Sequence, residues 1–134
     1  MLVLDASAFL VLVKQGARLG TVACHVVDQD STVSAANYAE VLQKADRVGI
    51  VAEKIDSQMD AFGITVSPFN RLDVRLAVSF YRHRSGLSLA DRVCLAIARS
   101  VASPAYTADR LWGSWAAELG VQVVVIRRGT PSVE

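Results

Sequence analysis

The sequence has 134 residues, 52% of them hydrophobic, and its 14 Lys or Arg and 13 Asp or Glu give a formal net charge of +1. This length fits a single domain over residues 1–134 that can bury its own core. The apolar run at residues 1–13 is interrupted by Asp5 and lacks a basic lead-in, and it is shorter than the roughly 20 apolar residues that cross a membrane. We therefore expect a cytoplasmic protein with no membrane partner.

Short apolar segments alternate with helical segments along the whole chain. Residues 1–5 form the first expected strand, and a buried helix is expected from Ala6 to about Val13. The later strands are expected at 31–35, 64–67, 104–107 and 121–126, before a polar tail, and the later helices at about 17–28, 36–48, 50–62, 70–85, 89–99 and 110–119. This alternation predicts a three-layer α/β/α domain, with a central parallel sheet of four to five short strands and helices on both faces.

Capping side chains mark several of the helix starts. Ser88 precedes the helix at 89–99 and Asp91 follows it by three residues, which is the spacing of a capping box. Asn70 and Asp109 are each placed to cap the helix that follows them. The sequence therefore predicts helix N-termini at the edge of the sheet where the strands end.

Four acidic residues lie where strands end or helices begin. Asp5 and Asp109 end two strands, Asp91 lies in the first turn of a helix, and Glu40 lies about one turn into another. In an open parallel sheet these positions share the crevice beyond the carboxyl ends of the strands, where ligands bind. Each acid also has a local explanation, because the three aspartates can cap helices and Glu40 can pair with Lys44.

Local roles do not explain why the four acids share one end of the sheet. Four like charges in one crevice repel one another unless a cation is present. Carboxylate oxygens favour a hard divalent ion, so we expect Mg²⁺, with Mn²⁺ as a substitute, held by Asp5, Asp91, Asp109 and Glu40. Three neighbouring polar residues are expected to support these acids: Ser7, Thr107 and Asn37. For Ser7 and Thr107 the alternative is the role of an ordinary turn hydroxyl.

Other chemistries find no pattern in this sequence. The two histidines, His25 and His83, lie on separate segments, and no Cys/His spacing suits a tetrahedral zinc site. Neither a glycine-rich phosphate loop nor a Gly-x-Ser-x-Gly motif is present. Cys24 and Cys94 lie far apart in apolar helical patterns, which favours two buried thiols over a disulfide.

The second half of the sequence is the basic one. Residues 70–134 contain nine Lys or Arg and five Asp or Glu, whereas residues 1–69 contain five and eight. Arginine binds phosphate through a planar fork, and tryptophan can stack on a base. The candidate substrate-binding residues are Arg82, Arg84, Arg92, Arg110 and Trp112. The alternatives are pairing of the arginines with neighbouring acids, and core packing of the tryptophan.

Four segments in register resemble the motifs of PIN-domain ribonucleases, specifically the VapC toxins of bacterial type II toxin–antitoxin systems. They are LDASA at 4–8, SAANYAEV at 34–41, GLSLADRVCLA at 86–96 and YTADRLW at 106–112. The resemblance implies a Mg²⁺-dependent endoribonuclease whose catalytic acids are Asp5, Glu40, Asp91 and Asp109. It also implies a homodimer and inhibition by a cognate VapB-type antitoxin that inserts a peptide near the site.

The sequence departs from the family pattern at two places and leaves alternatives open. Residues 14–18 replace an acidic, proline-bearing segment, and Asn70 stands where Asp is common, which bears on antitoxin fit and substrate choice. A catalytically silent binding scaffold and a structure-specific DNA nuclease on the same fold remain alternatives. A signalling receiver domain is disfavoured, because the strand at 64–67 does not end in an acid and Lys is absent after Lys54.

Overall fold

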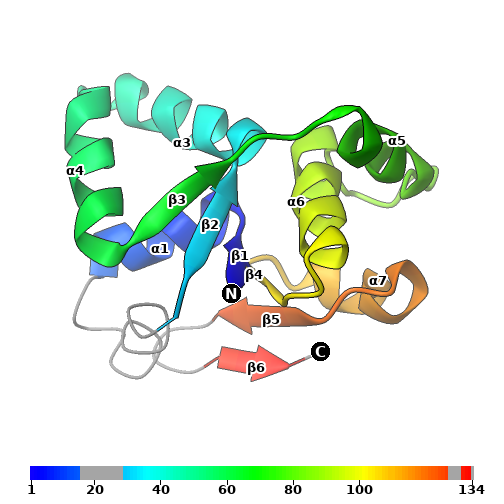
Figure 1. Ribbon diagram of the computed structural model, residues 1–134. Helices are drawn as coiled ribbons and strands as arrows, with labels where there is room; N and C mark the ends of the chain where they lie inside the picture. The colour runs from blue at the N-terminus through cyan, green and yellow to red at the C-terminus, as the bar shows by residue number, and fades with distance from the viewer. Residues whose placement is uncertain (16–28, 127–130, 134) are drawn as a thin grey trace.

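The computed structural model describes residues 1–15, 29–126 and 131–133. The elements, labelled as in Figure 1, are β1 (Leu2–Leu4), α1 (Ala6–Gln15), β2 (Ser31–Ser34), α3 (Ala35–Arg47), α4 (Ala52–Phe62), β3 (Ile64–Ser67), α5 (Arg71–Ser79), α6 (Leu89–Ser100), β4 (Ala105–Thr107), α7 (Leu111–Leu119), β5 (Val123–Ile126) and β6 (Pro131–Val133). The helix expected at 17–28 lies outside the described residues. No helix in the described part of the chain is long and apolar enough to span a membrane.

A single twisted sheet runs through the molecule in the order β3-β2-β1-β4-β5-β6. The five strands from β1 to β5 pair in parallel, which confirms the predicted parallel sheet. The short strand β6 pairs antiparallel with β5, where the sequence predicted only a polar tail. A strand of three residues is too short to show an alternating pattern in the sequence. Whether such a segment forms a strand depends on its pairing with a neighbouring strand.

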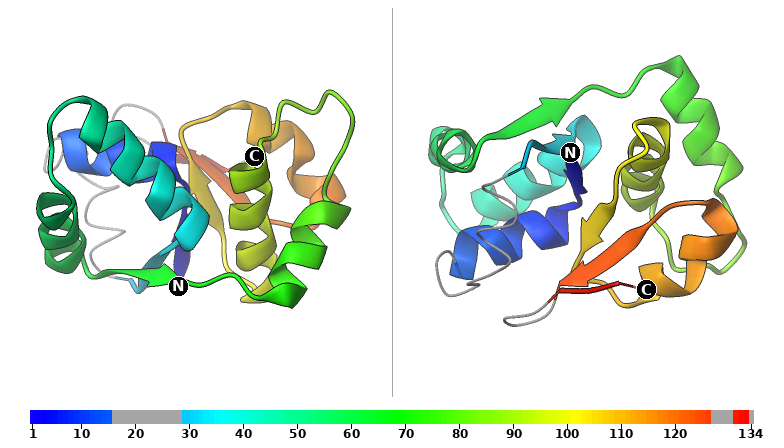
Figure 2. Two further views of the ribbon diagram at one scale, coloured as in Figure 1. Left: turned by 90° about the horizontal axis from the view of Figure 1, so that it is seen from above. Right: turned by 60° about the horizontal axis from the view of Figure 1, so that its bottom comes forward.

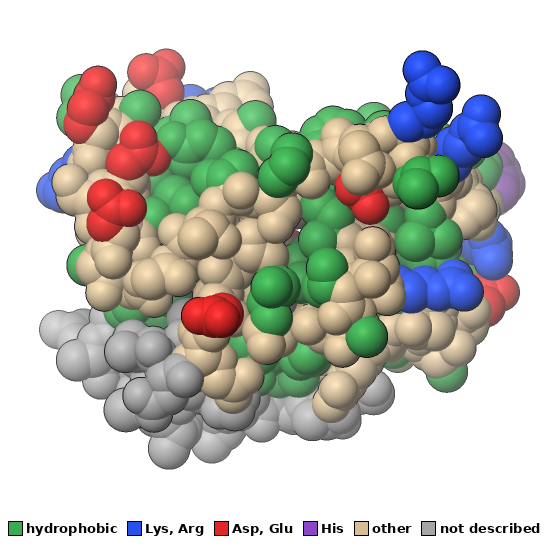
Figure 3. All heavy atoms as spheres, in the orientation of Figure 1, with side chains coloured by type: hydrophobic (Ala, Val, Ile, Leu, Met, Phe, Trp, Pro, Cys, Tyr) green, Lys and Arg blue, Asp and Glu red, His purple; other side chains and the backbone are tan. Residues whose placement is uncertain are grey.

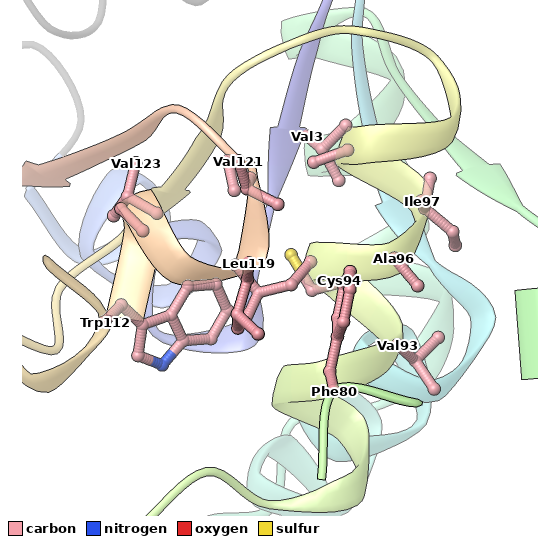
Figure 4. Packing of buried hydrophobic residues seen from close by; sticks show 14 of the residues in the cluster. Val3, Phe80, Val93, Cys94, Ala96, Ile97, Trp112, Leu119, Val121 and Val123 are labelled. Atoms are coloured by element: carbon pink, nitrogen blue, oxygen red, sulfur yellow. The ribbon is translucent and has the colours of Figure 1, made fainter. Parts of the chain in front are cut away.

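Helices cover both faces of the sheet (Figure 2). The two faces have separate hydrophobic cores. Successive residues of a strand point to opposite faces, so Leu2 and Leu4 pack in one core and Val3 packs in the other. The first core includes α1, α3 and α4. The second core, part of which is seen in Figure 4, includes α6 and α7. The predicted α/β/α layering is therefore confirmed.

Helix α5 is shorter than the sequence predicted. It ends at Ser79 instead of continuing to about Ser85. Arg84 and Gly86 have positive φ angles of 59° and 80°, which a right-handed helix does not allow. The apolar spacing that suggested more helix comes partly from Phe80, which is buried as the residue after the last turn.

The capping signals located the helix starts to within one residue. Ser88 and Asp91 form the predicted capping box at the start of α6, and Asn70 forms another with Asp73 at the start of α5. The structure places Arg110 at the N-cap of α7, one residue later than predicted, while Asp109 Oδ1 still accepts a hydrogen bond from the Leu111 N–H at 3.0 Å. The helix N-termini and the acids thus meet the carboxyl edge of the sheet.

Candidate acidic active site

Asp5 is the most enclosed of the four acids. It follows β1 directly and is 4% exposed. Its Oδ1 accepts from the Ala8 N–H at 2.7 Å, its Oδ2 accepts from the Thr107 hydroxyl at 2.6 Å, and the Ser7 hydroxyl lies 2.8 and 2.9 Å from the two oxygens. Burial raises the pKa of Asp5 from 3.8 to about 6, although these hydrogen bonds offset part of the rise. The side chain is therefore held in one position at an electrostatic cost.

The two hydroxyls beside Asp5 join segments that lie about a hundred positions apart in sequence. The Ala108 N–H donates to Ser7 Oγ at 2.9 Å, and the Asp109 N–H donates to Thr107 Oγ1 at 3.0 Å. The two hydroxyl oxygens lie 3.3 Å from each other. Each of the two hydroxyls thus contacts both the Asp5 carboxylate and the backbone of residues 108–109. An ordinary turn hydroxyl would bond only to its own turn.

Asp91 and Asp109 approach the same place from two further helix starts. The Ser88 N–H donates to Asp91 Oδ2 at 2.9 Å within the capping box. Burial raises the pKa of Asp91, and the charges of Glu40 and Asp109 raise it further, against hydrogen bonds from Ser88 that lower it. The charge of Asp91 in turn raises the pKa of Asp5. Asp91 is therefore close enough to each of the other three predicted acids for their charges to interact.

Glu40 is anchored within its own helix and not by the predicted alternative partner. The Asn37 side-chain N–H donates to Glu40 Oε1 at 3.0 Å. Lys44 makes no ion pair with it, since the described residues contain one ion pair, between Arg82 and Glu118. Ser34, which the sequence analysis did not single out, hydrogen-bonds Asn37 in turn. Ser34 could have been identified from the sequence by its position just before a predicted helix, where serine is a common N-cap.

A buried thiol lies beneath the acids on α6. Cys94 is fully buried and unpaired, as predicted, whereas Cys24 lies outside the described residues. Burial raises the pKa of Cys94 well above its ordinary value, and the charges of Asp5, Asp91 and Glu40 raise it further. The thiol therefore stays protonated and contributes no charge to the site.

The chemistry of the acids fits a hard divalent ion better than zinc. Within the described residues, no group of three or more His, Cys, Asp or Glu side chains is arranged to hold a metal ion. The groups whose charges interact with that of Asp91 are all carboxylates, and none of them is in an ion pair among the described residues. Repulsion from Glu40 and Asp109 contributes to the raised pKa of Asp91. A bound cation would offset that repulsion, and oxygen donors suit Mg²⁺ or Mn²⁺.

The structure corrects one candidate substrate residue. Trp112 is 0% exposed and packs in the core between the sheet, α6 and α7 (Figure 4). It therefore cannot stack on a nucleic-acid base. Because α7 begins at Leu111, its second residue faces the sheet, and the core-packing alternative holds.

The four candidate arginines lie in different surroundings. Arg82 bonds backbone carbonyls at the end of α5 and approaches Glu118 of α7, and the Arg92 guanidinium lies over the Tyr81 ring. Arg84 and Arg110 are exposed. On the face in Figure 3, most basic side chains gather on the side of α5 and α7, and most acidic ones over α3 and α4. Binding of substrate by these arginines stays a prediction.

Fold and site together define a three-layer α/β/α protein with a carboxylate-rich site at the carboxyl edge of its parallel sheet. Residues 2–114 match the PIN domain, and the chain belongs to this family, whose members are typically nucleases. A solved structure described as a toxin–antitoxin complex from Klebsiella pneumoniae shares the fold, with a TM-score of 0.61 and 17% identity, covering 81% of this chain and 87% of that chain. No curated protein sequence matches significantly.

Proposed function

We propose that the protein is a Mg²⁺-dependent endoribonuclease and the toxin of a VapBC-type toxin–antitoxin module. The observation that carries the proposal is the buried carboxylate of Asp5, which three hydrogen-bond donors hold in place and whose pKa the nearby charge of Asp91 raises further. Burying an acid beside another acid costs stability, and buried groups with shifted pKa values are frequent at functional sites. Membership of the PIN domain family supports a nuclease.

The reaction assigned to this site is hydrolysis of an RNA phosphodiester. Mg²⁺ or Mn²⁺, held by Asp5, Asp91, Asp109 and Glu40, would activate water and neutralise charge on the reacting phosphate. Ser7, Thr107 and the Ala8 N–H keep the Asp5 carboxylate oriented as an acceptor throughout.

Glu40 is the acid assigned to the proton of the attacking water. Asn37 donates to one of its carboxylate oxygens, Oε1, which leaves Oε2 as the oxygen assigned to the water. The water oxygen forms a bond to phosphorus as the bond to the 3′-oxygen breaks, so the downstream fragment carries a 5′-phosphate.

The proposed partners are RNA, a VapB-type antitoxin and a second copy of the chain. The antitoxin is supported by the similarity to a structure described as a toxin–antitoxin complex. Exposed apolar side chains on α5, Leu72 and Val78 among them, offer surface for a protein partner. A cytoplasmic location agrees with an RNA substrate.

The test is cleavage of total cellular RNA by the purified protein with Mg²⁺, with a chelator, and with Asp5→Asn. Glu118→Gln, which removes an exposed carboxylate of α7, is the matched control. Discrete fragments with 5′-phosphate ends that require both Mg²⁺ and Asp5 support the proposal. Cyclic-phosphate ends would contradict the mechanism, and cleavage of matched DNA alone would favour the DNA nuclease. Metal binding with no cleavage of either would favour the silent scaffold.

A further inference from the structure

We propose that Asn37 is a positioning residue that holds the Glu40 carboxylate in the orientation the reaction uses. The inference rests on the proposed function, in which Glu40 is one of the metal-binding acids. It concerns a chain of hydrogen bonds that starts at Ser34, the last residue of β2, and ends at Glu40, in the second turn of α3.

Ser34 and Asn37 make two reciprocal hydrogen bonds. The Asn37 backbone N–H donates to Ser34 Oγ at 3.0 Å, and the Ser34 hydroxyl donates to Asn37 Oδ1 at 2.5 Å. With Oδ1 occupied in this way, the amide nitrogen faces Glu40 and donates to Oε1 at 3.0 Å. A flipped amide would place an oxygen against a carboxylate, so the network admits one orientation.

Burial distinguishes this network from an ordinary surface pair. Residues three apart on an exposed helix often hydrogen-bond, and such pairs contribute little. Asn37, however, is 1% exposed and Ser34 is 0% exposed. An amide in that environment keeps its hydrogen bonds, because water is not available to replace them. The anchor on Glu40 is therefore rigid, although the Glu40 side chain is long and partly exposed.

The consequence for the site is a restrained Glu40 carboxylate. With Oε1 held by Asn37, Oε2 can occupy fewer positions relative to Asp91, whose pKa responds to the Glu40 charge. Without the anchor, Glu40 would occupy several rotamers. Loss of a hydrogen bond that orients a metal ligand commonly reduces metal affinity or activity by about 10- to 100-fold, and that loss is the effect expected of Asn37→Ala.

The experiment measures Mn²⁺ affinity and RNA cleavage in a double-mutant cycle of Asn37→Ala and Glu40→Gln. Mn²⁺ binding is read from the electron paramagnetic resonance signal of the free ion, and thermal unfolding confirms that each variant folds. Asn70→Ala is the matched control, because the Asn70 side chain also makes a hydrogen bond in the first turn of a helix, but Asn70 is exposed and precedes α5. Should Asn37→Ala fail to fold, Asn37→Ser carries the same test, since its hydroxyl is too short to reach Glu40.

We expect Asn37→Ala to lower Mn²⁺ affinity and the cleavage rate by about 10- to 100-fold, and to have no further effect when Glu40→Gln is already present. Asn70→Ala should leave Mn²⁺ affinity unchanged. A change of less than about twofold for Asn37→Ala, an equal loss in both backgrounds, or no Mn²⁺ binding by the unmodified protein would overturn the inference. If the unmodified protein binds Mn²⁺ without cleaving RNA, the proposed function fails, while the Mn²⁺ cycle still decides the role of Asn37.

Discussion

Replacing Asp5 with asparagine should stabilise the metal-free protein while abolishing its proposed activity. Asp5 is buried, and its charge faces the charge of Asp91. Asparagine removes the charge and keeps an oxygen that can accept from the Ala8 N–H. The change in the free energy of unfolding therefore measures how much the buried carboxylate destabilises the folded protein.

The magnitude follows from the pKa of Asp5, which burial raises from 3.8 to about 6. Between these values the folded protein holds a proton that the unfolded chain has released, so its stability falls as the pH rises from about 4 to about 6. At about 1.4 kcal/mol for each tenfold change, the full loss is about 3 kcal/mol above pH 6. The substituted amide disturbs the hydrogen bond from Thr107 at a cost of about 1 kcal/mol, which leaves a net gain of about 2 kcal/mol for Asp5→Asn.

The assay is urea unfolding followed by circular dichroism, with a chelator, between pH 5 and pH 8. Asp5→Asn should be more stable than the unmodified protein at pH 7.5, and the difference should shrink toward pH 5. Glu118→Gln, at an exposed site, should show no such dependence. Equal or lower stability of Asp5→Asn at pH 7.5 would refute the argument that burial raises this pKa.

Three further outcomes follow from the described contacts. Trp112→Ala should lower the free energy of unfolding by about 3 to 5 kcal/mol, whereas an unchanged urea midpoint would contradict its core position. Thr107→Val, which removes the donor to Asp5, should reduce RNA cleavage by about 10- to 100-fold; Thr107→Ser, which keeps it, should stay within a fewfold, and equal losses would show that the hydroxyl is irrelevant. In a Cys24→Ser background, Cys94 should react with a thiol reagent only on unfolding, and rapid reaction of the folded protein would contradict its burial.

The features predicted well from the sequence were those with local chemical signals. The capping box at Ser88 and the cap at Asn70 identified helix starts within one residue, and the alternation of strands and helices identified the sheet. The end of α5 at Ser79 was not predictable in this way, because the buried Phe80 continues the apolar spacing past it. The left-handed conformation of Arg84 excludes only a helix that reaches Ser85. The direction of Trp112 depends on where α7 starts, and a shift of one residue turns a side chain by about 100° around the helix.

The acids lie beside the N-termini of helices, which carry partial positive charge. Whether these helix ends neutralise the carboxylates bears on the proposed activity. Asp91 and Asp109 accept hydrogen bonds from backbone N–H groups at or just before helix starts, and Asp5 accepts from the first turn of α1. These bonds stabilise each carboxylate singly, yet the raised pKa values of Asp5 and Asp91 show that burial and repulsion outweigh them. A phosphate approaching this crevice meets net negative charge. On the proposed function, a divalent ion is therefore needed for RNA to occupy the site as well as for hydrolysis.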